Sequence, residues 1–165
     1  MYLNCHTYYS LRYGMMPVDK LVQKAKEAGA GAIALTDINN STGIPDFSAE
    51  CSKQGIRPIA GIEFRNGNDL QYIGLARNNK GLQELNEFLS DLNFKGTPVP
   101  FPAPAFDHSY IIYSQSYLPS RKLYNNERIG IRPSELSRLI SMPYDRDRMV
   151  ILRFEHQIAR CRLQF

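Results

Sequence analysis

Histidine and cysteine, the residues that most often hold zinc, are scarce in this chain: its 165 residues include three of each. The cysteines Cys5, Cys51 and Cys161 are far apart, and none belongs to a Cys-x-x-Cys pair. Zinc ribbons and dithiol redox sites need such pairs, so the sequence argues against both. Widely spaced, unpaired thiols fit a reducing compartment best, and we expect a cytoplasmic protein.

Long apolar runs are also missing. No stretch approaches the roughly 20 apolar residues that a membrane-spanning helix needs. The N-terminus has no basic region followed by an apolar run, as a signal peptide would. The sequence therefore predicts no membrane partner.

Charge of one sign does not dominate, because 20 Lys and Arg face 16 Asp and Glu, for a net charge of +4. Arginines crowd the C-terminal end at Arg146, Arg148, Arg153, Arg160 and Arg162. A mild basic bias is compatible with a nucleic-acid partner but does not demonstrate one. Few aromatic residues are interleaved with these arginines, so direct nucleic-acid binding is the weakest functional hypothesis.

The chain has enough apolar residues, 43% of the total, for a real core. Their periodicity predicts alternating strands and helices. The expected strands are residues 1–5, 32–36, 57–64, 70–76, 109–114, 128–131 and 149–154. The expected helices are residues 17–28, 43–54, 81–92 and 133–140. A proline-rich connector, 96–106, separates the two parts, and we expect it to cross the surface of one continuous domain. This order predicts an α/β sheet or barrel with right-handed crossovers.

Polar residues follow the first three predicted strands. Asn4 and His6 follow the first strand, Asp37 and Asn39 the second, and Glu63 the third. In a parallel arrangement these positions converge at the carboxyl ends of the strands. A group of imidazole, carboxylate and amide side chains resembles a hydrolytic metal centre.

Ligand counting weakens that interpretation. Strand alternation turns Cys5 away from Asn4 and His6, and no other histidine lies in this region. A catalytic zinc usually has three protein ligands. The alternative is purely structural: His6 forms local hydrogen bonds, Asp37 caps a loop, and Glu63 faces a polar funnel.

Four segments together resemble a known family. They are HTYYSLRYG (6–14), LVQKAKEAGAGAIALTDINNSTGIPDF (21–47), GIRPIAGIEF (55–64) and LARNNKGLQELNEFLS (75–90). In this order they are similar to the N-terminal PHP (polymerase and histidinol phosphatase) domain of bacterial DNA polymerase III α subunits. The connector and residues 121–139 are similar to the α subunits of the Bacteroidetes group. The resemblance implies a distorted (β/α)7 TIM-like barrel with a multi-metal cluster at the carboxyl ends of its strands.

At the ligand positions this sequence departs from the family. The His-x-His opening of metal-binding members is Asn4-Cys5-His6 here. In the turn that follows, Tyr13 stands where those members often have an acidic residue or His. The Thr-Asp-His-Asn motif carries Ile38 in place of its histidine, between Asp37 and Asn39. A histidine of the next strand aligns with Gln71. Of the family's metal ligands, His6 and Glu63 remain.

The C-terminus departs from the family as well. Related sequences continue past residue 150 to an Asp-x-His motif that Glu155 and His156 do not reproduce. We expect a PHP domain over residues 1–154 whose barrel is incomplete, and a divergent or non-native tail over residues 155–165. An incomplete barrel leaves sheet edges open, so self-association is expected.

Two main hypotheses follow from the resemblance. The first is a scaffold within a replicative DNA polymerase, which is a nucleotidyltransferase. The polymerase active site, with its Mg²⁺, would then lie outside this chain. Its partners would be the rest of the α subunit and the proofreading exonuclease, and DNA would be met only through the holoenzyme. No cofactor is then expected. The second is a Zn- or Mn-dependent phosphoesterase or 3′–5′ exonuclease that uses His6, Asp37 and Glu63.

Overall fold

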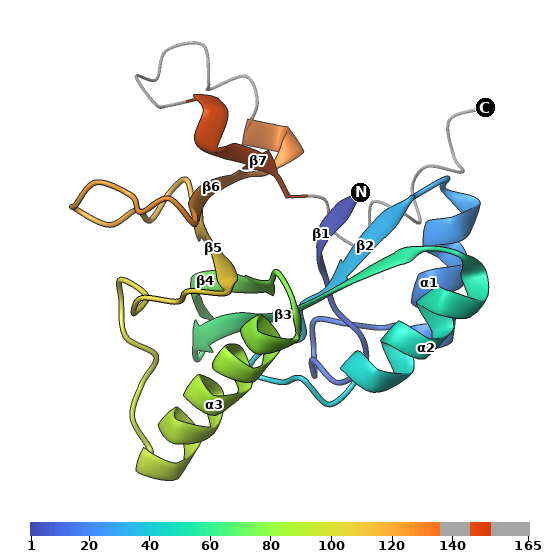
Figure 1. Ribbon diagram of the computed structural model, residues 1–165, viewed down its shortest axis with the longest axis horizontal. Coiled ribbons are helices and arrows are strands. Elements are labelled where there is room, and N and C mark those ends of the chain that lie inside the picture. Colours follow the sequence, from blue (N-terminus) through green and yellow to red (C-terminus); the bar gives the residue numbers. More distant parts are fainter. Residues whose placement is uncertain (136–145, 153–165) are drawn as a thin grey trace.

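The computed structural model describes residues 1–135 and 146–152 (Figure 1). Its elements, in chain order, are β1 (Tyr2–Cys5), α1 (Val18–Glu27), β2 (Ala32–Leu35), α2 (Ile44–Gln54), β3 (Arg57–Asn66), β4 (Asp69–Ala76), α3 (Asn79–Lys95), β5 (Ser109–Ser114), β6 (Glu127–Ile131), the 3-10 turn η2 (Arg146–Arg148) and β7 (Met149–Ile151). The predicted order of strands and helices is confirmed, with most boundaries shifted by a few residues.

Three expectations reach beyond the described residues. The helix expected at 133–140 begins as a short helical turn at 133–135, and its remainder lies outside the described residues. The last strand, expected at 149–154, spans Met149–Ile151, and residues 153–154 lie outside the described part. The tail expected at 155–165 also lies outside it.

One mixed sheet holds the seven described strands in chain order, β1 to β7. Neighbouring strands are parallel except at β4, which runs antiparallel to both β3 and β5. The sheet curls so that β1 and β7 face each other across its concave side (Figure 1). On that side Leu3, Ile73, Ile112 and Leu152 belong to one apolar cluster. The fold is therefore a curled α/β half-barrel, as the family resemblance predicts.

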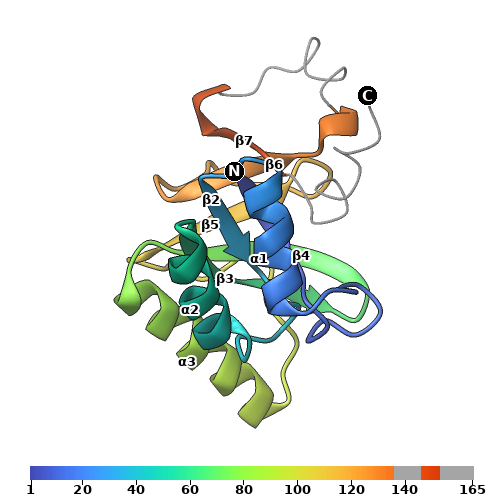
Figure 2. The same ribbon diagram turned by 90° about the vertical axis from the view of Figure 1, so that its right-hand side faces the viewer.

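Helices cover the convex side of the sheet (Figure 2). The apolar face of α1 is fully buried at Leu21, Val22 and Ala25, where it packs with Phe47 of α2 and Ile33 of β2. Burying a leucine or valine side chain stabilises the fold by about 1.5–3 kcal/mol. Helical spacing in the sequence thus fixes which side of β1–β3 these two helices cover.

The proline-rich connector is mostly exposed, and three of its side chains anchor it to the core. Val99, Ala103 and Phe106 pack into the cluster between α3 and the sheet. Prolines keep this segment extended, and its polar backbone groups find side-chain partners instead of a helix or sheet. The Asn66 side chain bonds both the N–H and the C=O of Val99, at 2.8 and 2.9 Å.

The hairpin between β3 and β4 determines what reaches the carboxyl edge of the sheet. Gly67-Asn68 forms its turn, between the paired residues Asn66 and Asp69, and Gly67 has a φ of 59°, which favours glycine. Because β4 runs backwards, its beginning, near Gln71, lies beside the ends of the other strands. Among the described residues, no helix is long and apolar enough to cross a membrane.

Candidate functional site

The polar residues at the carboxyl ends of β1, β2 and β3 are buried. Asn4, His6, Asp37 and Glu63 each expose 3% or less of their surface. Buried polar groups are costly unless they are hydrogen-bonded, so their partners show what the site can do. The structure places these four residues in two separate hydrogen-bonded groups.

Glu63 is the centre of the first group. Its Oε2 lies 3.1 Å from Nε2 of His6, and its Oε1 accepts a hydrogen bond from Nε of Arg65. Burial raises the pKa of the Glu63 carboxyl. The hydrogen bond and charge of His6, with smaller contributions from Arg65 and Asn4, outweigh burial and hold this pKa below its usual value. Glu63 is therefore a carboxylate with both oxygens already engaged.

Arg65 is the functional residue that sequence reasoning missed. Its guanidinium lies 4.3 Å from the centre of the Tyr13 ring and donates to the backbone O of Asn68 at 3.3 Å. The Tyr13 hydroxyl donates to Oδ1 of Asn68 at 3.2 Å. A signal was present, because residues two apart in a strand share a face, and Arg65 follows Glu63 at that spacing.

Asp37 is the centre of the second group: its backbone O accepts from the N–H of Glu63 at 3.2 Å, but its carboxylate has other partners. Its carboxylate accepts hydrogen bonds from the backbone N and Oγ1 of Thr7, each at 2.7 Å, and from Oγ of Ser10 at 2.6 Å. The Ser10 hydroxyl accepts in turn from the N–H of Ile38 at 2.9 Å. Asp37 thus ties the loop after β1 to the end of β2.

Asn4, Ile38 and Asn39 connect the strand ends to one another. Asn4 accepts a hydrogen bond from Oγ1 of Thr36 at 2.7 Å. Ile38 extends β2 by bridging to Glu63. Asn39, with a φ of 46°, pairs its side-chain amide with the backbone N and O of Arg65, at 3.0 and 2.9 Å.

Gln71 lies beside this region. Among the described residues, no hydrogen bond joins its side chain to Glu63. Its Nε2 donates to the backbone O of Asp69 at 3.1 Å. Gln71 and Arg65 both line an open cavity of about 570 Å³ at the carboxyl edge. The cavity wall also includes Tyr117 and Arg132.

The donor set does not fit a multi-metal cluster. Within the described residues no three His, Cys, Asp or Glu side chains come together as a metal site would need. A cation at Glu63 would also have to displace the guanidinium of Arg65 from Oε1. At Tyr13, Ile38 and Gln71 the side chains are poor or impossible metal ligands.

A curled α/β half-barrel with a buried polar group at its carboxyl edge defines the class of this protein. The PHP domain family model matches residues 3–132, and the chain belongs to the PHP family.

Sequence comparison with curated proteins finds DNA polymerase III α subunits. DNA polymerase III subunit alpha of Staphylococcus epidermidis is 30% identical over 128 residues, which are 74% of this chain and 12% of that protein. The same subunit of Staphylococcus aureus strain N315 is 36% identical over 94 residues, 55% of this chain and 9% of that protein. The chain spans about an eighth of the length of such relatives.

Among solved structures, an amidohydrolase from Chromobacterium violaceum has a TM-score of 0.46 at 20% identity, covering 58% of this chain and 34% of the other. A putative metal-dependent phosphoesterase from Bifidobacterium adolescentis has a TM-score of 0.45 at 19% identity, covering 56% of this chain and 31% of the other.

Proposed function

We propose that this chain is the PHP-domain part of a replicative DNA polymerase α subunit and serves DNA replication as a non-catalytic scaffold. Its similarity to DNA polymerase III subunit alpha over 128 residues supports the parent protein. Polymerase chemistry, with its Mg²⁺, belongs to other parts of such a protein.

One observation carries the non-catalytic interpretation: both oxygens of Glu63 are occupied by protein groups. A buried carboxylate needs a compensating charge, which a metal ion supplies in metal-binding sites. Here Arg65 supplies that charge from the same strand, with 14% of its side chain exposed. The guanidinium stabilises the pocket permanently, and a metal ion is no longer needed for folding.

A scaffold needs a surface for partners, and the loop after β1 offers one. Leu11 and Met15 are 82% and 91% exposed, and Tyr8 is 48% exposed. These three side chains come from one stretch of eight residues, and an exposed apolar patch is a common mark of protein interaction sites. The partners we propose are the remainder of the α subunit and the proofreading exonuclease subunit, with DNA reached only through the assembled holoenzyme.

Binding to the exonuclease subunit tests the scaffold role. Calorimetry with the purified subunit from the same organism should give a complex, and Leu11→Ser with Met15→Ser should weaken it at least tenfold. The matched control, Phe94→Ser, changes a side chain that is 92% exposed at the end of α3 and should leave affinity unchanged. Absence of binding by the unmodified chain contradicts the docking role.

The alternative is a metal-dependent phosphoesterase or exonuclease. The observation in its favour is the contact between His6 and Glu63, two residues of the family's ligand set, at a strand end. It predicts hydrolysis of p-nitrophenyl phosphate or of a 3′ DNA end that Mn²⁺ stimulates and His6→Ala abolishes. Under the scaffold proposal, the chain hydrolyses neither substrate when Mn²⁺ is added, and His6→Ala behaves like the unmodified chain.

A further inference from the structure

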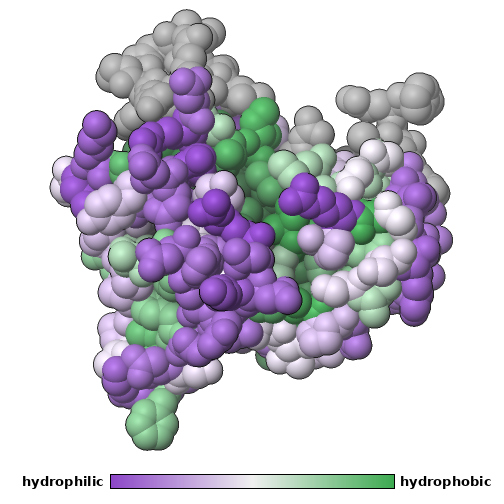
Figure 3. All heavy atoms as spheres, in the orientation of Figure 1, coloured by the Kyte–Doolittle hydropathy of each residue, from purple (hydrophilic) through white to green (hydrophobic). Residues whose placement is uncertain are grey.

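A second cavity lies at the end of the half-barrel opposite to Glu63. It has a volume of about 460 Å³ and opens where the parallel strands begin. Figure 3 shows a hydrophobic strip in the hollow between the two halves of the molecule, bordered by hydrophilic atoms. None of the residues discussed above as remnants of the metal site lines it.

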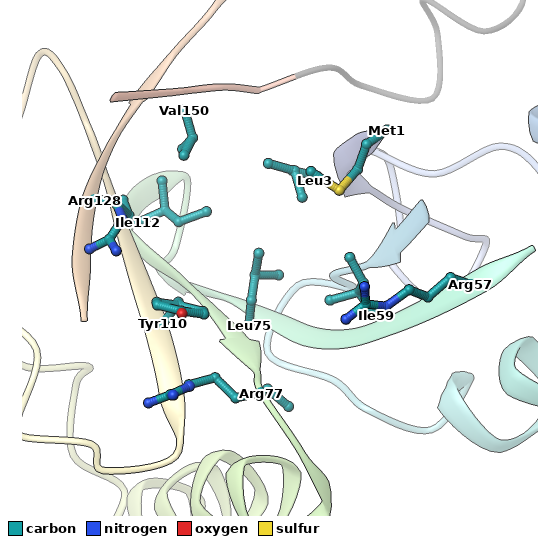
Figure 4. A pocket seen from close by; sticks show the side chains of 11 residues that line it. Met1, Leu3, Arg57, Ile59, Leu75, Arg77, Tyr110, Ile112, Arg128 and Val150 are labelled. Carbon is teal, nitrogen blue, oxygen red and sulfur yellow. The ribbon is translucent and has the colours of Figure 1, made fainter. Parts of the chain in front are cut away.

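The wall of this cavity is apolar. Leu3, Leu75 and Ile112 are at least 93% buried and belong to the cluster inside the curled sheet. Ile59 and Val150 add to the wall, and Leu3, Leu75 and Val150 point into the space between β3 and β5 (Figure 4). A cavity of this size and polarity is in the range that holds a small molecule.

Three arginines from three strand ends surround the apolar wall. Arg57 begins β3, Arg77 follows β4, and Arg128 lies in β6. The guanidinium carbons of Arg77 and Arg128 each lie 5.2 Å from the centre of the Tyr110 ring. They stand on either side of that ring in Figure 4, while Arg57 approaches from across the cavity.

These three arginines have no carboxylate partner among residues 1–135 and 146–152, and no Asp or Glu lines the cavity. Within that part of the chain, Arg128 donates to two backbone oxygens, at 2.7 and 2.9 Å. Elsewhere two half-buried arginines pair with carboxylates: Arg65 with Glu63, and Arg121 with Glu127. Of the three cavity arginines, Arg57 and Arg77 are exposed, and the half-buried Arg128 has no carboxylate partner among the described residues. The contrast marks this cavity as one with an excess of positive charge.

We propose that this cavity binds a small amphiphilic anion: an organic phosphate or carboxylate whose apolar body enters between β3 and β5. Guanidinium groups match the planar or tetrahedral oxygens of such anions through charge-assisted hydrogen bonds. The apolar body gains from leaving water against Leu75 and Ile112. A cation would be repelled, and a neutral apolar molecule would leave the arginines without a partner.

Calorimetry on the full chain with three matched probes tests this proposal. Phenyl phosphate carries both parts, inorganic phosphate only the anion, and phenol only the apolar body. The expected result is saturable binding of phenyl phosphate, with at least tenfold weaker binding of each of the other two. Equal affinity for phenyl phosphate and inorganic phosphate overturns the proposal, and so does the absence of phenyl phosphate binding at millimolar concentration.

Charge reversals locate the site. Arg57 and Arg77 are exposed and make no side-chain hydrogen bond to described residues, so Arg57→Glu and Arg77→Glu should fold normally. Each should weaken phenyl phosphate binding at least fivefold. The control Arg12→Glu makes the same charge change in the exposed loop at the other end of the half-barrel. An equal loss in Arg12→Glu would show general attraction to a basic surface and overturn the assignment to this cavity.

Discussion

At Glu63 a buried carboxylate is stabilised by an arginine two residues along the same strand. The carboxylate of Glu63 is completely buried, and His6 and Arg65 occupy its two oxygens. Such pairs add little compared with an apolar replacement, but removing one partner leaves an uncompensated buried charge. The arrangement therefore makes Arg65 more important to folding than its position near the surface suggests.

Substitution of Arg65 by methionine should lower the free energy of unfolding by about 3 kcal/mol, because Glu63 then keeps only His6 as a charged partner. Urea unfolding followed by circular dichroism measures this loss. The double variant Arg65→Met, Glu63→Gln should regain part of it, since the buried charge is gone. A loss below about 0.5 kcal/mol in Arg65→Met would show that the ion pair contributes nothing, as exposed pairs often do.

Acid should destabilise the fold through Glu63 and Glu127. Burial alone would raise the pKa of each, but His6 and Arg65 at Glu63, and Arg121, Tyr124 and Tyr113 at Glu127, lower it below the usual value. A carboxyl whose pKa is lower in the folded state stabilises the protein above its unfolded pKa of about 4.3. This stabilisation is lost as the pH falls from there through the folded pKa.

Urea midpoints between pH 7 and pH 3 measure that loss. We expect the urea concentration at the midpoint to decrease once the pH is below about 4.3. The decrease should be less steep in Glu63→Gln, which lacks one of the two groups. A midpoint that rises or stays constant between pH 5 and pH 3 contradicts the assigned direction of the pKa shifts.

At the scale of elements, local signals predicted the order well. The 3.6-residue spacing of Val18, Leu21, Val22 and Ala25 predicted α1, and the strands expected at 57–64 and 70–76 form the hairpin of β3 and β4. These signals depend on neighbouring residues and survive in any tertiary context.

The candidate site was less predictable, because its contacts join residues far apart in the chain. Asp37 and Glu63 both stand at strand ends, yet Asp37 bonds Thr7, 30 residues away, and Glu63 bonds His6, 57 residues away. Position at a strand end predicts a shared edge of the sheet but not which donors each carboxylate accepts from. That the site holds no metal ion stays a prediction.

Helix α3 offers a local test of capping. The Asn78 side chain accepts a hydrogen bond from the N–H of Gly81 at 3.0 Å, as an N-cap residue does. Asn78→Ala should reduce the free energy of unfolding by about 1 kcal/mol. Its neighbour Asn79 is exposed and is the first helical residue, so Asn79→Ala should cause no loss. Equal urea midpoints for both variants would contradict the capping role.

At the scale of the whole molecule, the described sheet has two edge strands. Strand β1 pairs only with β2, and β7 only with β6, among the strands that the structure describes. Open edges favour pairing with another chain. We therefore predict that the apparent mass in light scattering rises with protein concentration, and a monomer mass at every concentration would contradict this.

The central claim is that Arg65 has taken the place of the metal charge beside Glu63, and metal uptake tests it most directly. The purified chain would be stripped with EDTA, incubated with Zn²⁺ or Mn²⁺, desalted and analysed for metal per chain. We predict far less than one ion per chain, with no change in His6→Ala. One or more ions per chain, lost in His6→Ala, would contradict the account.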